Sequence, residues 1–354
     1  MWKWEWICWF ISLISRTPQV RVRRFRRLVE RLSREADQDG DWWTVFREYP
    51  KRATESDNVL PGRSRGSSVA IVMQGPIIDR DDLSLETIRL YRRTMPNAEI
   101  IVSTWNDVSD NARSRVLETG ALIVTSEPPE ERGPHNLNMQ IACTRRGMEE
   151  AHALGFDYVM KTRLDTRIHT HHADQFCIDL LEQFPVGSSI GQSKRIVVMD
   201  FATRLYIPYH PSDMMMFGAT EDLLFYWSLP LCGPEQTFRV CDEFDRMLEQ
   251  SIPEIVVGRS YFQRRGLELT GQLDQWWQLL ADQFVVIDRD MIDFFWPKYN
   301  YNVDQRLGMK WDTSNMALCH FNQWMQIQSR RLKPQVTIDQ LKTQQVYEPL
   351  PVAA

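Results

Sequence analysis

A regular alternation of apolar runs and helical repeats between Val69 and Asp165 constrains the fold more than any other feature of this 354-residue chain. Short runs of apolar and β-branched residues, typical of buried parallel strands, lie at 69–73, 99–105, 121–125 and 157–165. Apolar residues at helical spacing lie between them, at 84–95, 110–119 and 137–151. Strands that alternate with helices predict a parallel sheet with right-handed crossovers. The predicted fold class is therefore α/β, with a Rossmann-like, mostly parallel sheet flanked by helices.

The second half of the chain is less regular. Further strands are predicted near 195–200, 214–217 and 284–287, and helices near 220–227, from Pro253 onward and at 275–280. The predicted domains are an N-terminal extension with a linker at 1–66, one large domain at 67–330, and a polar, loosely held tail at 331–354. The boundary falls at 61–68, a stretch of glycine, serine and arginine after a proline.

Composition and motifs exclude several classes of function. The formal net charge is -5, so bulk binding to nucleic acid is not expected. The six cysteines are scattered without a CxxC pair, which argues against a disulfide or zinc framework and fits a reducing cytoplasm. The turn after the first strand, Gln74-Gly75-Pro76, is not GxGxxG, and the P-loop motif occurs nowhere. These absences disfavour a dinucleotide-dependent dehydrogenase and a P-loop enzyme, and the missing glycine-rich loop also disfavours a nucleotidyltransferase.

The first thirty residues combine tryptophans with arginines. Trp2, Trp4, Trp6 and Trp9 precede a cluster of arginines between positions 16 and 27. The apolar run is shorter than the roughly 20 residues that span a bilayer. We expect this segment to lie on an anionic membrane surface, which makes the protein cytoplasmic and peripheral on the inner membrane. A helix packed on the protein's own core and a signal peptide are the alternatives.

Charged residues gather at the end of the 157–165 strand. Lys161, Arg163 and Asp165 alternate onto one face of it. Buried charges must meet water, each other or a ligand, and ligands of open α/β sheets bind beyond the carboxyl ends of the strands. We therefore expect Asp165 to face a metal or phosphate site, with Arg163 and Arg167 beside it. An edge strand with a solvated ion-pair face is the alternative.

A set of short motifs runs along most of the chain in a fixed order. They are residues 72–76, Tyr91, Pro96, residues 100–105, residues 138–141, Gly147, residues 161–165, Ser212-Asp213 and Phe217-Gly218. In order and spacing they resemble the WavE lipopolysaccharide-synthesis family of bacterial glycosyltransferases, over about residues 68–320. The resemblance implies a GT-A-like fold, a nucleotide-sugar donor and a role in surface polysaccharide. GT-A enzymes usually end this strand in Asp-x-Asp, which holds Mn²⁺ or Mg²⁺; here Asp165-Thr166-Arg167 has an arginine in the second position.

Glycosyl transfer needs positive charge for the diphosphate leaving group and a base for the acceptor hydroxyl. Guanidinium groups can bind phosphate bidentately, and a divalent metal on Asp165 would bind phosphate oxygens. Trp105 can stack on the nucleobase or pack in the core. The predicted donor-binding residues are Gln74, Gly75, Pro76, Ser103, Thr104, Trp105, Asp107, Asn138, Gln140, Lys161, Arg163 and Arg167. Two of them begin the 137–151 helix, whose N-terminus attracts anions, although both can be plain capping groups.

The base is predicted to be Asp213, just before a buried strand, with Glu254 as the second candidate. A carboxylate placed against an acceptor hydroxyl suits an inverting single displacement. Turn chemistry is the alternative role for Asp213. His320 is a candidate late metal or phosphate ligand, with a buried neutral histidine as the plainer alternative. The histidines at 169, 171 and 172 are predicted to form a solvated turn rather than a metal site.

Together these patterns predict a glycosyltransferase. It would move a sugar from a nucleotide-sugar donor to lipopolysaccharide or another polysaccharide or lipid-linked acceptor, with Mn²⁺ or Mg²⁺ as candidate cofactor. The alternative is a non-catalytic nucleotide-sugar-binding or scaffold protein of the envelope polysaccharide machinery, in which Asp165-Thr166-Arg167 marks a dead site. Nucleic acid is not an expected partner.

Overall fold

The computed structural model describes residues 51–53, 66, 68–188, 190–239, 241–297 and 314–350, and the single positions 24, 27, 28 and 31. The chain divides into two compact units, 1–50 and 51–354, and all elements named below belong to the second. The predicted membrane-surface segment and most of the predicted linker lie outside the described residues. Among the residues that are described, no helix has both the length and the hydropathy needed to cross a bilayer.

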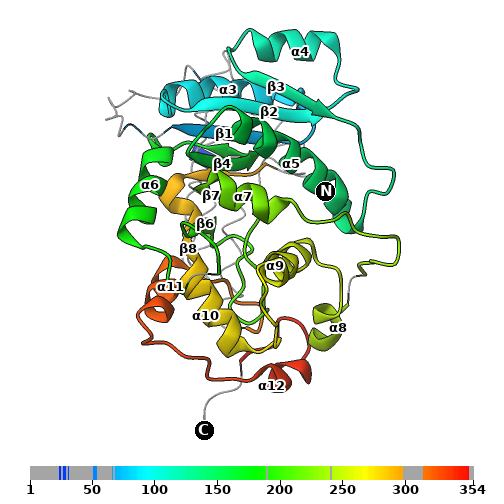
Figure 1. The fold of residues 1–354 in the computed structure, drawn as a ribbon, viewed down its shortest axis with the longest axis vertical. Helices are drawn as coiled ribbons and strands as arrows, with labels where there is room; N and C mark the ends of the chain where they lie inside the picture. Colours follow the sequence, from blue (N-terminus) through cyan, green and yellow to red (C-terminus); the bar gives the residue numbers. More distant parts are fainter. Residues whose placement is uncertain are drawn as a thin grey trace. The chain divides into compact units, whose positions relative to one another are not determined.

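A seven-stranded sheet with the order β3-β2-β1-β4-β7-β6-β8 organises the second unit (Figure 1). The strands are β1 (Val69–Gln74), β2 (Glu99–Trp105), β3 (Leu122–Ser126), β4 (Tyr158–Arg163), β6 (Ile196–Met199), β7 (Met216–Ala219) and β8 (Phe284–Ile287). β1 pairs in parallel with β2 and β4, β2 with β3, and β6 with β8. The predicted α/β class with a mostly parallel sheet is confirmed, including the four strands expected between 69 and 165.

Strand β7 is the exception, because it runs antiparallel to both β4 and β6. Met216, at its start, pairs with Lys161 near the end of β4. The reversal therefore carries the residues just before β7, including Asp213, to the edge where β4 ends. A separate two-stranded sheet joins β5 (Arg167–Ile168) to β9 (Phe294–Phe295) just beyond that edge.

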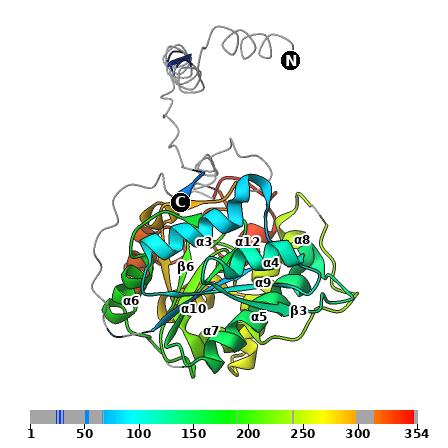
Figure 2. The same ribbon diagram turned by 90° about the horizontal axis from the view of Figure 1, so that it is seen from above.

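Helices cover both faces of the sheet. They are α3 (Leu83–Thr94), α4 (Asp110–Leu117), α5 (Leu137–Ala153), α6 (Ala173–Gln183), α7 (Thr220–Trp227), α8 (Phe244–Leu248), α9 (Pro253–Arg264), α10 (Leu273–Gln283), α11 (Phe321–Gln328) and α12 (Ile338–Lys342), with short 3₁₀ turns η3 (Arg80–Asp82), η4 (Pro134–Asn136) and η5 (Arg289–Ile292). Figures 1 and 2 show α5 and α7 side by side on one face, with α3 on the other. Gly147 lets α5 lie directly on the sheet, because a Cβ there would sit 3.1 Å from the Cβ of Ser103 and closer still to Val72.

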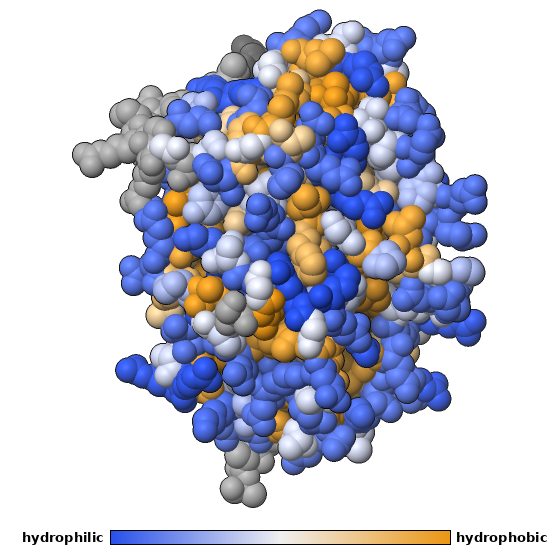
Figure 3. All heavy atoms as spheres, in the orientation of Figure 1, coloured by the Kyte–Doolittle hydropathy of each residue, from blue (hydrophilic) through white to orange (hydrophobic). Residues whose placement is uncertain are grey.

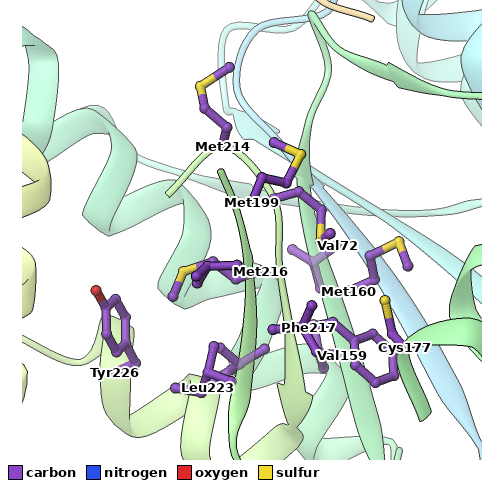
Figure 4. Close-up of a cluster of buried hydrophobic side chains, with 14 of the residues drawn as sticks. Val72, Val159, Met160, Cys177, Met199, Met214, Met216, Phe217, Leu223 and Tyr226 are labelled. Atoms are coloured by element: carbon purple, nitrogen blue, oxygen red, sulfur yellow. The ribbon is translucent and has the colours of Figure 1, made fainter. Parts of the chain in front are cut away.

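The centre of the core is rich in methionine. Met160, Met199 and Met216 are fully buried beside Val159 and Phe217, on three neighbouring strands (Figure 4). Strands covered on both faces bury nearly every residue, which explains the continuous apolar runs in the sequence. Unbranched methionines fill irregular gaps between helices and sheet.

The C-terminal part of the chain differs from the expected loose tail. Val336, Ile338 and Leu341 are buried and join Phe244 of α8 in a second, smaller apolar cluster. Thr337 caps α12 by accepting a hydrogen bond from the backbone N–H of Gln340 at 3.3 Å. The prediction of a loosely held tail is wrong for this stretch, because Ile338 and Leu341 of α12, together with Val336 just before it, are buried against residues far away in sequence.

Single apolar side chains are exposed on the surface of the described residues. Leu117, Leu122 and Leu154 are each between 39% and 52% exposed. The face in Figure 3 intersperses polar and apolar residues. Isolated exposed leucines are ordinary on protein surfaces, so by themselves they indicate no binding surface.

Candidate functional site at the carboxyl edge of the sheet

The ends of β1, β2 and β4 lie next to one another. Gln74 pairs with Ser103 on one side and with Arg163 on the other, and the backbone N–H of Leu164 donates to the carbonyl of Gln74 at 3.0 Å. Residues paired across parallel strands share a face, so these side chains and that of Lys161 belong to the face covered by α5 and α7. The structure thus brings the polar ends of the predicted strands together.

Lys161 is the most deeply buried charge at this edge. Its side chain is fully buried, its ammonium donates to the backbone carbonyl of Asp213, and it lies 4.8 Å from the ring centroid of Trp227. Burial lowers the pKa of Lys161 to about 8, although the nearby charge of Asp213 partly opposes that change. The lysine is therefore a cation in a poorly hydrated place, where its field acts strongly on neighbouring carboxylates.

Asp213 ends a loop that begins after β6. The residue is 5% exposed, and its carboxylate accepts a hydrogen bond from the side-chain amide of Gln140. The loop is fastened internally, since the backbone N–H of Ser212 donates to the hydroxyl of Thr203 at 2.9 Å. Gln140 lies in the first turn of α5, so two of the predicted site residues, Gln140 and Asp213, come into direct contact.

Glu254 lies at the start of α9, directly after Pro253 in the first helical position. Burial raises the pKa of Glu254 to about 7, and the negative charge of Asp213 adds to the rise, while Arg204 and Lys161 oppose it. Gly258, one turn later, makes this approach possible, because a Cβ there would collide with the backbone carbonyl of Tyr209. The helix thereby holds a second carboxylate against the loop that carries Asp213.

Arg163 and Asp165 form a closed pair. The guanidinium donates to both carboxylate oxygens, at 2.7 and 2.8 Å, and the indole N–H of Trp296 donates to Asp165 at 3.0 Å. Burial alone would raise the pKa of Asp165, but the hydrogen bond and charge of Arg163 outweigh burial and hold that pKa below its usual range. Both oxygens of the predicted metal ligand are thus already engaged.

Arg167 faces α3 instead of the site. Its guanidinium is buried and donates to the hydroxyl of Thr87 at 2.9 Å and to the carbonyl oxygens of Leu83 and Lys51 at 3.2 and 3.3 Å. The turn after β4 explains why Arg163 and Arg167 point to different places. Arg167 lies beyond this turn, at the start of β5, and so does not share the face of β4 that carries Arg163. The structure does not bring Arg167 together with Asp165 and Lys161.

Asn138 is likewise a structural clamp. Its amide donates to the carbonyl oxygens of Glu131 and Cys232, both at 2.9 Å, and its oxygen accepts the N–H of Cys232 at 2.7 Å. Ser103 donates to the carbonyl of Cys143 at 2.6 Å and so ties β2 to α5. Both hydrogen-bonding patterns serve packing between elements of the fold.

The remaining predicted donor-binding residues take several positions. Gly75 adopts a positive φ of 116°, and its N–H donates to the carbonyl of Ser103 at 3.0 Å. Thr104 is buried on the face of the sheet opposite to Ser103, Trp105 is 9% exposed, and Pro76 and Asp107 are exposed. Exposure leaves Pro76 and Asp107 available to a ligand, whereas Thr104 is buried inside the fold.

A second charged group lies where β6 and β8 end. Asp200 follows β6, Asp288 follows β8, and His320 precedes α11. The Nδ1 of His320 lies 3.1 Å from Asp200 Oδ2 and 3.4 Å from Asp288 Oδ1. Within the described residues this is a set of three side chains whose ligand atoms lie within 4.8 Å of one another. The sequence indicated His320 as a candidate metal or phosphate ligand but neither of the two aspartates. The signal that could have indicated them is their position, because each directly follows an apolar strand.

The class of protein follows from this arrangement: an α/β protein whose charged groups collect at the carboxyl edge of its sheet, where such folds bind ligands. Residues 69–343 match the family described as WavE lipopolysaccharide synthesis. The match spans most of the chain, so the chain belongs to this family, and the resemblance of its motifs is confirmed. No curated protein has a matching sequence.

Solved structures give only distant likenesses. A protein assigned as a nucleotide-diphospho-sugar transferase from Desulfovibrio desulfuricans G20 is 8% identical, with 57% of this chain and 78% of that chain covered and a TM-score of 0.33. Glucosyl-3-phosphoglycerate synthase from Mycobacterium tuberculosis, in complex with Mn²⁺, UDP and glucosyl-3-phosphoglycerate, is 14% identical, with 63% and 70% covered and a TM-score of 0.34. Scores this low carry no argument about the function of this chain.

Proposed function

We propose that the protein is a glycosyltransferase that moves a sugar from a nucleotide-sugar donor to a lipopolysaccharide or other surface-polysaccharide acceptor. Membership of the WavE family supports a role in lipopolysaccharide synthesis. The observation that carries the proposal is the pair of carboxylates, Asp213 and Glu254, set against the cation of Lys161 at the carboxyl edge of the sheet. A base beside fixed positive charge is what displacement of a nucleoside diphosphate by a hydroxyl group needs.

The reaction would be a single displacement. The acceptor oxygen bonds to the anomeric carbon of the donor, the bond from that carbon to the phosphate oxygen breaks, and the diphosphate leaves with the electron pair. A carboxylate takes the proton of the acceptor hydroxyl. Lys161 and Arg163 would favour the developing negative charge on the leaving group, because both lie at the edge where the strands end.

Glu254 suits the role of base better than Asp213. A general base works best when its pKa lies near the operating pH, and burial together with Asp213 raises the pKa of Glu254 to about 7. Asp213 accepts a hydrogen bond from Gln140, and its negative charge contributes to the raised pKa of Glu254. We therefore assign proton removal to Glu254 and a positioning and tuning role to Asp213, in the reverse of the order that the sequence suggested.

Transfer assays can test this assignment. The full-length chain is first screened for thermal stabilisation by nucleotide sugars, since a ligand that binds only the folded state raises its melting temperature. Release of nucleoside diphosphate from the stabilising donor is then followed with a lipopolysaccharide-core acceptor. Glu254→Gln should lose transfer while donor binding is kept, and the exposed Glu249→Gln is the matched control.

Two outcomes would contradict the proposal. Full activity of Glu254→Gln would remove the assigned base. Donor binding without turnover on any acceptor would favour the alternative function, a non-catalytic nucleotide-sugar-binding or scaffold protein. The closed Arg163–Asp165 pair and the structural role of Arg167 are what such a protein would also have.

We further propose that the protein works on the cytoplasmic face of the inner membrane, held there by its N-terminal tryptophans and arginines. The full chain should sediment with phosphatidylglycerol vesicles in low salt but not with phosphatidylcholine vesicles. The chain from residue 51 onward should remain in the supernatant with both. Equal sedimentation of the two chains would refute the membrane role.

A further inference from the structure

The group of Asp200, Asp288 and His320 takes no part in the chemistry assigned above. Its three members come from distant parts of the sequence and meet because β6 and β8 are parallel neighbours, with α11 beginning beside them. The backbone N–H of Asp200 donates to the carbonyl of Ile287 at 2.7 Å, which continues the pairing of these strands to their ends. The sheet itself therefore fixes the two aspartates side by side.

Two of the distances among the three ligand atoms match those in an octahedral metal site. Two ligands at right angles, each about 2.1 Å from a small divalent cation, lie about 3.0 Å apart. The Nδ1 of His320 is 3.1 Å from Asp200 Oδ2 and 3.4 Å from Asp288 Oδ1. The imidazole nitrogen thus lies within a few tenths of an ångström of the expected distance from each carboxylate oxygen, and all three ligand atoms lie within 4.8 Å of one another.

Hydrogen bonds from the backbone orient both aspartates. The N–H of Arg289 donates to Asp200 Oδ1 at 2.8 Å, which turns Oδ2 toward the histidine. The N–H of Phe321 donates to Asp288 Oδ1 at 2.9 Å. The first bond falls on the oxygen that is not offered to the metal, as is typical of metal sites. The second falls on the candidate ligand oxygen itself and holds that oxygen in place.

Exposure increases from one side of the group to the other. The side chain of Asp200 is 2% exposed, that of His320 is 23% exposed and that of Asp288 is 34% exposed. A metal there would have a rigid inner ligand and an open outer side for water or for a ligand's phosphate oxygens, as catalytic sites require. The guanidinium Nε of Arg289 lies 3.7 Å from Asp200 Oδ2, beyond hydrogen-bond distance. Asp165, by contrast, has both oxygens in hydrogen bonds with Arg163 and Trp296.

We propose that Asp200, Asp288 and His320 form a binding site for a divalent cation of the Mn²⁺ or Mg²⁺ type, which replaces the site expected at Asp165. Between these two ions the imidazole favours Mn²⁺, because Mg²⁺ is bound mainly through oxygen ligands. When bound, the cation would supply positive charge for the donor's diphosphate. The role of the cation toward the diphosphate rests on the proposed glycosyl transfer. The existence of the cation site does not depend on that proposal.

The simpler reading of the same contacts is a protonated His320 bridging two carboxylates. That arrangement needs no metal and would keep the geometry through ion pairs alone. The two readings differ in one measurable property, which is saturable binding of Mn²⁺ by the protein in the absence of any nucleotide.

Electron paramagnetic resonance of free Mn²⁺ tests the site, since the ion's solution signal falls as it binds. The full chain at pH 7.5 is titrated with Mn²⁺ alone, without donor. Asp288→Asn and His320→Ala should weaken binding by about 10-fold to 100-fold or more. Asp165→Asn and the exposed Asp290→Asn should leave the affinity unchanged. Asparagine at 288 can still accept the N–H of Phe321, so this variant keeps the local hydrogen bond, and circular dichroism checks that it folds.

Three results would overturn the proposal: no saturable binding by the unmodified chain, equal affinity in all variants, or loss of binding in Asp165→Asn alone. If His320→Ala does not fold, Asp288→Asn decides by itself. None of these results bears on glycosyl transfer, which is measured separately with the unmodified chain in the presence and absence of EDTA. Transfer that survives EDTA would leave the proposed enzyme in place without its cation.

Discussion

Two pairs of charged residues at the end of β4 show opposite electrostatic behaviour. Arg163 and Asp165 neutralise one another through two hydrogen bonds, and the pKa of Asp165 is held below its usual range. Glu254 and Asp213 are instead two carboxylates whose charges interact, one half-buried and one buried, and desolvation together with the charge of Asp213 raises the pKa of Glu254 to about 7. A carboxylate paired with arginine is a stable anion, whereas a carboxylate beside another can hold and release a proton near neutral pH. A charged residue that belongs to a sequence motif therefore need not be the residue that reacts.

The largest effect is expected from Glu254→Gln. Loss of a general base should lower kcat by about 10²-fold to 10⁴-fold, with little change in donor affinity. Asp165→Asn, at the other pair, should reduce kcat far less. Measurement of kcat and KM for both variants tests whether only the Glu254–Asp213 pair is catalytic. An equal loss of kcat in both variants would contradict that difference between the two pairs.

Substitution of the two arginines near Asp165, Arg163 and Arg167, should have different effects on stability and on donor binding. Arg167→Ala removes a buried cation with three hydrogen-bond acceptors and should lower the free energy of unfolding by about 2–3 kcal/mol. Arg163→Ala removes two of the three side-chain hydrogen bonds that Asp165 accepts from described residues and should instead weaken donor binding, with a smaller change in stability. Urea unfolding and nucleotide-sugar titration of each variant test this, and the reverse pattern would place Arg167 at the site.

The pH profile should report the coupling between the carboxylates. The groups that face Glu254 include Asp213, Arg204, Lys161 and Tyr226. In the unmodified enzyme kcat/KM should rise with pH through about 7, as Glu254 loses its proton. Asp213→Asn removes a neighbouring negative charge, so the rise should move to lower pH, while Lys161→Met should move it to higher pH. A profile that shifts in neither variant would mean that another group acts as the base.

The smallest expected effect is the change that Glu254→Gln makes in the pH dependence of the free energy of unfolding. The folded pKa of Glu254, about 7, exceeds its ordinary value of 4.5, so between these values the folded state binds more protons than the unfolded state. The free energy of unfolding therefore falls as pH rises from about 4.5 to about 7. Glu254→Gln should raise the melting temperature at pH 8, with the gain shrinking toward pH 4.5. A gain that does not depend on pH would contradict the raised pKa.

Much of the fold could be predicted from local patterns. Apolar runs and helical spacing between 69 and 165 identified four strands and their parallel pairing, because a strand buried on both faces must be apolar along its length. All strands of a parallel sheet end at the same edge, so the polar residues that follow them come together there. Lys161, Arg163, Asp213, Glu254 and His320 were all named as candidate site residues in this way or by resemblance to the WavE family, and their roles stay predictions.

Tertiary packing alone decided which partner each polar group received. Arg167 stands two residues beyond Asp165, yet the turn into β5 sends its guanidinium to α3. Asn138 begins a helix, yet it clamps a loop that lies 94 positions away in sequence. Asp200 and Asp288 become neighbours only because β6 and β8 pair. A sequence shows the period of each strand, since that period follows from backbone geometry; the partners of a side chain depend on contacts between distant segments, which only the folded chain brings together.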